Sequence, residues 1–270
     1  MVEPDERSEE VSRPPAPPTV SLHLHPDWPA RAPGLTVLES VVRDGRYLSQ
    51  FATGTSNGGL TAHPGGDRWR WESRLFEGRY DDAPAPARPV YGALDRGWAA
   101  YGPAPRFGSA YLLLRPAVLE RTTFCFPDSV LEPAGVVGPD GLAPLEQAAA
   151  AARTTGGDPL DDYVEAHVHG GVGLDDVAGV VLDPTAADTP GAEAARAAGL
   201  EVRSHPGYDV AVAGLPDDYR GPGPVALARR LARDGRLDPA LLAAAAARRT
   251  HDPQALKRAW HLLARFGRRV

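Results

Sequence analysis

Hydrophobic and polar residues alternate in several short stretches of the chain, which is typical of β-strands with one buried face. The first such stretch covers residues 19–25, and the clearest is YVEAHVHGG at 163–171. Side chains two residues apart in a strand point to the same face. The pattern therefore predicts that Glu165, His167 and His169 share one surface, as metal ligands, as acid/base groups or as a polar rim.

Helical spacing of apolar residues appears between these stretches. We expect a helix over 34–48 that stops at Gly45, a strand running into a loop over 47–59, and loops carrying short elements over 61–88. Further strands are expected within 89–95, 108–126, 161–172, 175–184 and 201–207, and further helices within 143–155, 189–200, 223–235, 238–249 and 252–267. This order of elements predicts an α+β fold.

Charge divides the chain of 270 residues unevenly around its net charge of −6. Residues 221–270 carry a net charge of +8, whereas residues 1–220 carry −14. The basic segment also has a strong apolar stripe, so we expect it to form helices packed on the acidic body, in preference to binding nucleic acid. The expected organisation is a disordered tail over 1–18, an α+β domain over 19–220 and a helical segment over 221–270.

Composition narrows the function classes further. No apolar run is long enough to span a membrane and the acidic, Pro-rich N-terminus is unlike a secretory signal, so a cytoplasmic protein without a membrane partner is expected. Cys125 is the single cysteine, which rules out an internal disulfide and any Cys-based zinc site. Its neighbours are Phe124 and Phe126, which favours a buried, unreactive thiol.

Two other stretches could bind a ligand. His23 and His25 share one face of the first strand, where they could bind a metal, contact a ribose or stand at a polar strand end. The stretch TGTSNGG at 53–59 combines glycine freedom with short polar groups, and it could approach a phosphate or amide closely. It contains neither the Walker nor the Rossmann fingerprint. The loop residues in question are Thr53, Gly54, Thr55, Ser56 and Asn57.

The chain resembles an uncharacterised bacterial family that is catalogued as a domain of unknown function. The resemblance rests on QFATGTSNGGLTAHPGGDRWRWESRLF, RPVYGALD, PRFGSAYLLLRP, EAHVHGG and DPQALKRAWHLLARFG, and it spans roughly residues 20–267. Membership of that family implies no activity by itself.

The stretches LHLH, TVLESVVRDGRYL, ATGTSNGG and VEAHVHGGVGLDDVAGVVL follow one another within roughly residues 20–185. This order of elements also resembles the ADP-ribosyltransferase superfamily, whose split β-sandwich binds NAD in a cleft. The resemblance implies a core of that type with a C-terminal helical cluster, and NAD as the substrate. It implies that Glu165 is the catalytic carboxylate, with His167 as a general base. The NAD-binding residues that it implies are His23, His25, Thr53, Gly54, Thr55, Ser56, Asn57 and Tyr91.

Two further classes stay open at this stage. A metal-dependent hydrolase could use His23, His25, His167 and His169 as ligands, with Glu165 as a base or fifth ligand. A non-catalytic ligand-binding protein is the third possibility. Under the first hypothesis, ADP-ribose would pass to an acceptor that the sequence leaves unidentified: a protein side chain, a nucleic acid, a small molecule or water.

Overall fold

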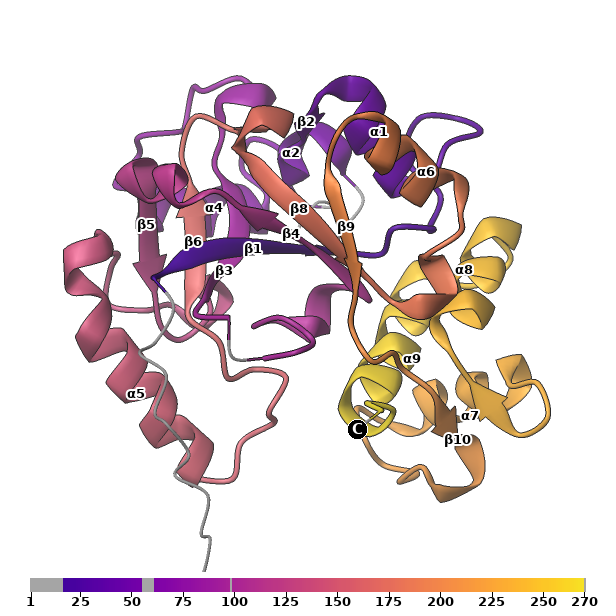
Figure 1. Ribbon diagram of the computed structural model, residues 1–270. Coiled ribbons are helices and arrows are strands. Elements are labelled where there is room, and N and C mark those ends of the chain that lie inside the picture. The colour runs from indigo at the N-terminus through magenta and orange to yellow at the C-terminus, as the bar shows by residue number, and fades with distance from the viewer. Residues whose placement is uncertain (1–16, 55–60, 98, 270) are drawn as a thin grey trace, which may run out of the picture.

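The fold is built on one seven-stranded sheet, seen in a computed structural model that describes residues 17–54, 61–97 and 99–269 (Figure 1). The strands lie in the order β5-β6-β3-β1-β4-β8-β9. Every pair is antiparallel except β8 and β9, which run parallel. The bounds are β1 Thr19–Leu24, β3 Val90–Asp95, β4 Ala110–Leu114, β5 Thr122–Cys125, β6 Glu165–Val168, β8 Val177–Leu182 and β9 Glu201–Ser204.

The two faces of this sheet differ because alternate residues point to opposite sides. One face carries aliphatic side chains such as Leu22, Leu112 and Val168, and all three are fully buried in the main core. That core also takes in residues from α1 (Val37–Asp44), α5 (Leu142–Thr154) and α6 (Pro190–Ala197). Several polar residues of the same strands, such as Ser21, His23 and Glu165, lie on the opposite face.

Helix α1 illustrates how local sequence sets the element ends. Thr36 caps its N-terminus, and the Glu39 carboxylate accepts a hydrogen bond from the Thr36 backbone N–H at 2.8 Å, which completes a capping box. The helix stops at Gly45, whose φ of 66° is costly for a residue with a side chain. The remaining helices are α2 Gln50–Thr53, α4 Asp67–Leu75, α7 Pro222–Leu231, α8 Pro239–Arg248 and α9 Pro253–Phe266.

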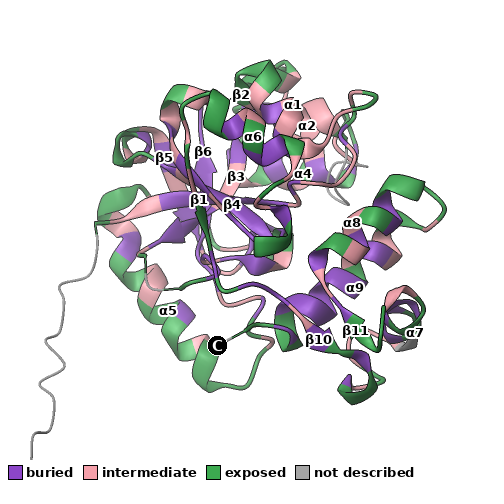
Figure 2. Cartoon of the chain, turned by 45° about the vertical axis from the view of Figure 1, so that its right-hand side comes forward, coloured by how far each residue is buried: buried purple, intermediate pink, exposed green. Residues whose placement is uncertain are grey.

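The three C-terminal helices form a second hydrophobic cluster beside the sheet (Figure 2). Trp260 of α9 is fully buried in it and donates a hydrogen bond from its indole to the carbonyl of Pro105 at 2.9 Å. Leu160 and Tyr101, from loops of the acidic body, belong to the same cluster. The basic segment therefore packs against the body through apolar contacts. Two short sheets, β2 (Arg46–Tyr47) with β7 (Val172–Gly173) and β10 (Val210–Ala211) with β11 (Arg236–Leu237), complete the fold.

The two edges of the large sheet are arranged differently. At one edge, the residues of β9 are mostly exposed, and Arg203 forms an ion pair with Glu201 at 2.7 Å. At the other edge, Phe124 of β5 exchanges backbone hydrogen bonds with Val137, at 2.8 and 2.9 Å.

The α+β class and most of the expected elements are confirmed. The expected strand over 47–59 is wrong: β2 ends at Tyr47, and Gln50–Thr53 form a helical turn capped by Ser49. Helix α4 lies in the region expected to be mostly loops. Thr55, Ser56 and Asn57 lie outside the described residues. Among the described residues, the strands of four or more residues all belong to one sheet.

Candidate functional site

Glu165 is the first residue of β6 and lies on the polar face of the sheet. It is in register with Ala93 on β3 and with Cys125 on β5. One of its carboxylate oxygens, Oε1, is 2.9 Å from Nε2 of His167, and both residues are buried. The expectation that Glu165, His167 and His169 lie together is correct, although β6 ends at Val168 and His169 follows in a turn.

A chain of hydrogen bonds runs from Glu165 to the edge of the sheet. Nδ1 of His167 is 3.2 Å from the Thr123 hydroxyl, which is 2.9 Å from Nε2 of His169. Nδ1 of His169 is in turn 2.5 Å from the hydroxyl of Tyr80. Five polar groups on neighbouring elements are thus linked in one row.

The proton positions in this row depend on one another. When His167 is neutral and donates to Glu165, Thr123 donates to His167, His169 donates to Thr123, and Tyr80 donates to His169. When His167 carries protons on both nitrogens, it donates to Thr123, and each later bond reverses. The Thr123 hydroxyl therefore links the proton positions of the two histidines.

Burial and nearby charged groups shift the pKa values of the acidic residues at this site. Burial would raise the pKa of Glu165, but the hydrogen bond and electrostatic attraction of His167, together with Arg68, lower it below its ordinary value. Burial, followed by the charge of Glu165, raises the pKa of nearby Asp128, which accepts a hydrogen bond from Tyr163. Glu165 is therefore the carboxylate held in its ionised form.

Helix α4 covers this part of the polar face. Phe76, which follows the helix, places its ring edge-on to His167, with the ring centroids 5.2 Å apart. Glu72 is fully buried and accepts hydrogen bonds from Arg88 at 2.6 Å and from the Tyr91 hydroxyl at 2.9 Å. The buried Arg68 lies over the Tyr91 ring.

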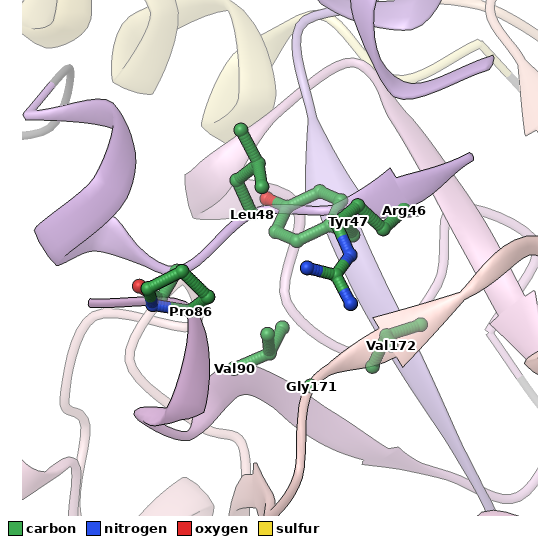
Figure 3. Close-up of a pocket in the computed structure, with 8 residues that line it drawn as sticks. Arg46, Tyr47, Leu48, Pro86, Val90, Gly171 and Val172 are labelled. Atoms are coloured by element: carbon green, nitrogen blue, oxygen red, sulfur yellow. The ribbon is translucent and has the colours of Figure 1, made fainter. Parts of the chain in front are cut away.

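A pocket of about 590 Å³ borders the hydrogen-bonded row. This volume lies within the range of about 300–1,000 Å³ that is usual for ligand sites. Its lining includes Trp71, Arg74, Phe76, Arg79, Thr123, Ser129, Glu132 and His169. Figure 3 shows a second pocket, lined by residues such as Tyr47 and Val172, whose volume of about 10 Å³ holds no more than a single water. The larger pocket is the better candidate for a ligand.

The two histidines of the first strand lie in separate surroundings. His23 is on the polar face, where Nε2 accepts a hydrogen bond from the backbone N–H of Ala104 at 3.2 Å. His25 stacks on Trp28 and meets Trp260 edge-on, with centroids 4.1 and 4.9 Å away. Burial lowers the pKa of each histidine to about 3, so both are neutral near pH 7. A ribose contact from either one stays a prediction.

The four histidines of the metal hypothesis are not gathered into one site. Among the described residues, the group of three or more ligand atoms within 4.8 Å of one another consists of Cys125, Glu165 and His167. Cys125 thus lies within reach of two other ligand types, whereas the single cysteine was expected to rule out any Cys-based zinc site. Burial and the charge of Glu165 raise the pKa of the Cys125 thiol, so it stays protonated without an ion.

Sequence reasoning missed several members of the site. Thr123 links two histidines, and Arg68 and Glu72 cover the face from α4. The alternation of polar and apolar residues in β5 could have indicated Thr123 and Cys125. Of the Gly-rich loop, Thr53 ends α2 and Gly54 caps it with a φ of 60°.

The comparison with protein families now adds to this geometry. The model of the family described as "Protein of unknown function (DUF3626)" matches residues 19–139 and 142–266. The chain belongs to the DUF3626 family. No curated protein matches this DUF3626 chain. No helix among its described residues is both long and apolar enough to cross a membrane.

Proposed function

We propose that this protein is an NAD-dependent ADP-ribosyltransferase that cleaves the bond between nicotinamide and ribose and transfers ADP-ribose to an acceptor. The observation that carries the proposal is the common face of His23, Tyr91 and Glu165 on three adjacent strands, β1, β3 and β6. Ser21 pairs with Ala93, which pairs with Glu165, and His23 and Tyr91 each lie two residues from this row. A core of the ADP-ribosyltransferase type is part of the proposal.

In the proposed reaction, the ionised Glu165 stabilises positive charge on the ribose as its bond to nicotinamide breaks. Nicotinamide departs with the bonding electrons, and the acceptor then forms a new bond to the same carbon and releases a proton. A positioned charge of this kind is worth about 3 kcal/mol. Both ring nitrogens of His167 lie within hydrogen-bonding distance of Glu165 or Thr123, so this residue orients the carboxylate in preference to serving as a free base.

The adjoining pocket supports a dinucleotide as the substrate. Its volume of about 590 Å³ suits a ligand of that size, and its wall includes Thr123 and His169 of the row that ends at Glu165. Arg74 and Arg79 line it, so cations are present for an anionic ligand, although Arg74 also pairs with Glu132. The acceptor can be a protein side chain, a nucleic acid, a small molecule or water.

The test is NAD turnover followed by mass detection of nicotinamide and of ADP-ribose or its adduct. We expect Glu165→Gln, which keeps the side-chain shape, to lower the rate by about 10²–10³-fold. Glu146→Gln is the matched control. Glu146 lies on α5 and forms a partly exposed ion pair with Arg96 at 2.8 Å. Equal turnover by the two variants, or no NAD binding by the wild-type protein, would sink the proposal.

A second candidate function is metal-dependent hydrolysis, and one observation favours it. The Cys125, Glu165 and His167 ligand atoms lie within 4.8 Å of one another. These are ligand types that zinc accepts, and a bound metal could activate water. The hydrogen bond between His167 and Glu165 also explains their proximity without an ion. Elemental analysis after growth with added zinc, manganese or iron tests it: fewer than about 0.2 equivalents would remove this candidate.

A further inference from the structure

Arg68 is held in one orientation by two aromatic rings. The carbon at the centre of its guanidinium lies 3.7 Å from the centroid of the Tyr91 ring and 5.1 Å from that of Trp71. The residue is only 5% exposed. Contacts with both rings restrict the guanidinium, so little conformational entropy remains to be lost if its N–H groups bind a partner.

The Nε and Nη2 atoms of Arg68 are buried and have no hydrogen-bond partner within the part of the chain that the structure describes. These two atoms share the edge of the guanidinium that grips both oxygens of a carboxylate or phosphate. Arg96 shows this use in the same chain, because its Nε and Nη2 each lie 2.8 Å from one oxygen of Glu146. The equivalent edge of Arg68 therefore suits an oxyanion.

The nearby carboxylates do not fill this role. Glu72 accepts from Arg88 and from Tyr91. Glu165 is attracted to Arg68 by its charge, but its Oε1 atom forms a hydrogen bond with His167. Leaving buried N–H groups unpaired is destabilising, and more so when the group is charged. The indole N–H of Trp71 is also buried and has no partner among the described residues, and Trp71 lines the pocket of about 590 Å³.

We propose that the Nε–Nη2 edge of Arg68 is an oxyanion subsite that binds a phosphate group of the ligand. The identity of that ligand as NAD, with its diphosphate at Arg68, rests on the proposed function, whereas the chemistry of the subsite does not. The subsite would place the phosphates beside Tyr91, on the polar face that also carries Glu165.

The test compares ligands with and without phosphate by isothermal titration calorimetry. The ligands are NAD, ADP and nicotinamide riboside, and the proteins are wild type, Arg68→Gln and Arg70→Gln. Arg70 lies on the same helix in an exposed ion pair with Asp67, so it is the matched control. We expect Arg68→Gln to weaken NAD and ADP by at least about tenfold and to leave nicotinamide riboside unchanged. Unchanged affinity for both phosphate-bearing ligands would overturn the subsite.

Arg68→Lys keeps the subsite testable if Arg68→Gln does not fold. Lysine retains the charge but lacks the paired N–H edge, so ADP should raise the melting temperature of the wild type more than that of Arg68→Lys. An equal rise in both proteins counts against the subsite. If ADP binds through Arg68 but NAD is not consumed, the subsite stands and the transferase fails. If NAD is consumed and Arg68→Gln leaves its KM unchanged, the transferase stands and the subsite fails.

Discussion

The two faces of the seven-stranded sheet come from the same strands, but they are stabilised in different ways. One face is filled by aliphatic side chains such as Leu22 and Leu112, and their removal from water favours the folded state. The other face holds His23, Glu165 and His167, which tolerate burial only while their polar atoms have partners. Stability should therefore depend on volume at the first face, and on protonation and hydrogen bonding at the second.

Lowering the pH should destabilise the protein through the buried histidines of the polar face, and this should be the largest effect. Burial lowers the pKa of His23 to about 3 and that of His169 to about 4, whereas an unfolded histidine titrates near 6.5. Below pH of about 6.5 the unfolded chain therefore binds more protons, and the free energy of unfolding falls as the pH decreases toward 4. Each histidine contributes up to about 1.4 kcal/mol per pH unit.

Urea unfolding at several pH values between 7.5 and 4 measures this loss. Carboxylates add to the same slope, so the informative quantity is the difference between wild type and His169→Gln. The variant should show a shallower slope between pH 6 and 4.5, because one histidine no longer gains a proton on unfolding. Identical slopes would mean that His169 does not contribute.

Truncation on the apolar face should act on stability alone. Leu112 is fully buried in β4, an interior strand of the sheet, so Leu112→Ala should lower the free energy of unfolding by about 2–5 kcal/mol. Nicotinamide release per folded molecule should stay at the wild-type value below the melting temperature. Val130→Ala is the control, since Val130 is 49% exposed and its truncation should change stability by about 0.5 kcal/mol or less. Loss of activity in folded Leu112→Ala would show that the faces are not independent.

Removing one hydroxyl from the polar face should have the smallest effect. Thr123→Val keeps the side-chain shape but leaves nitrogens of His167 and His169 unpaired, which should cost about 1–3 kcal/mol. Nitrogen NMR of the histidines adds a sharper readout: in the wild type, the Thr123 hydroxyl should couple the tautomers of His167 and His169. Thr123→Ser should keep this coupling and Thr123→Val should lose it. Coupling that persists in Thr123→Val would contradict the row of hydrogen bonds.

Alternation in the sequence was enough to predict the polar face but not its contacts. The spacing of Glu165 and His167 placed both residues on one surface because side-chain direction in a strand follows a period of two. Thr123 and Cys125 alternate in the same way, but their proximity to Glu165 depends on the register between β5 and β6. Pairing between strands 40 residues apart in sequence leaves no mark within either strand.

Helix α4 shows a different limit. Its sequence DRWRWESRL has two tryptophans and three arginines, and no apolar stripe marks one face. The helix instead buries Arg68 and Glu72 against the polar side of the sheet. A pattern based on hydrophobicity cannot reveal a helix whose inward face is charged. The covering of the candidate site therefore became visible only in the structure.

The arrangement of the sheet edges has a consequence for self-association. An unpaired edge strand exposes backbone N–H and C=O groups that can pair with another copy, which is a common route to aggregation. Glu201 and Arg203 place both signs of charge along β9, and Val137 already pairs with Phe124 of β5. Extension of the sheet from one copy into the next is therefore disfavoured at both ends, and the protein should resist fibrous assembly even at high concentration.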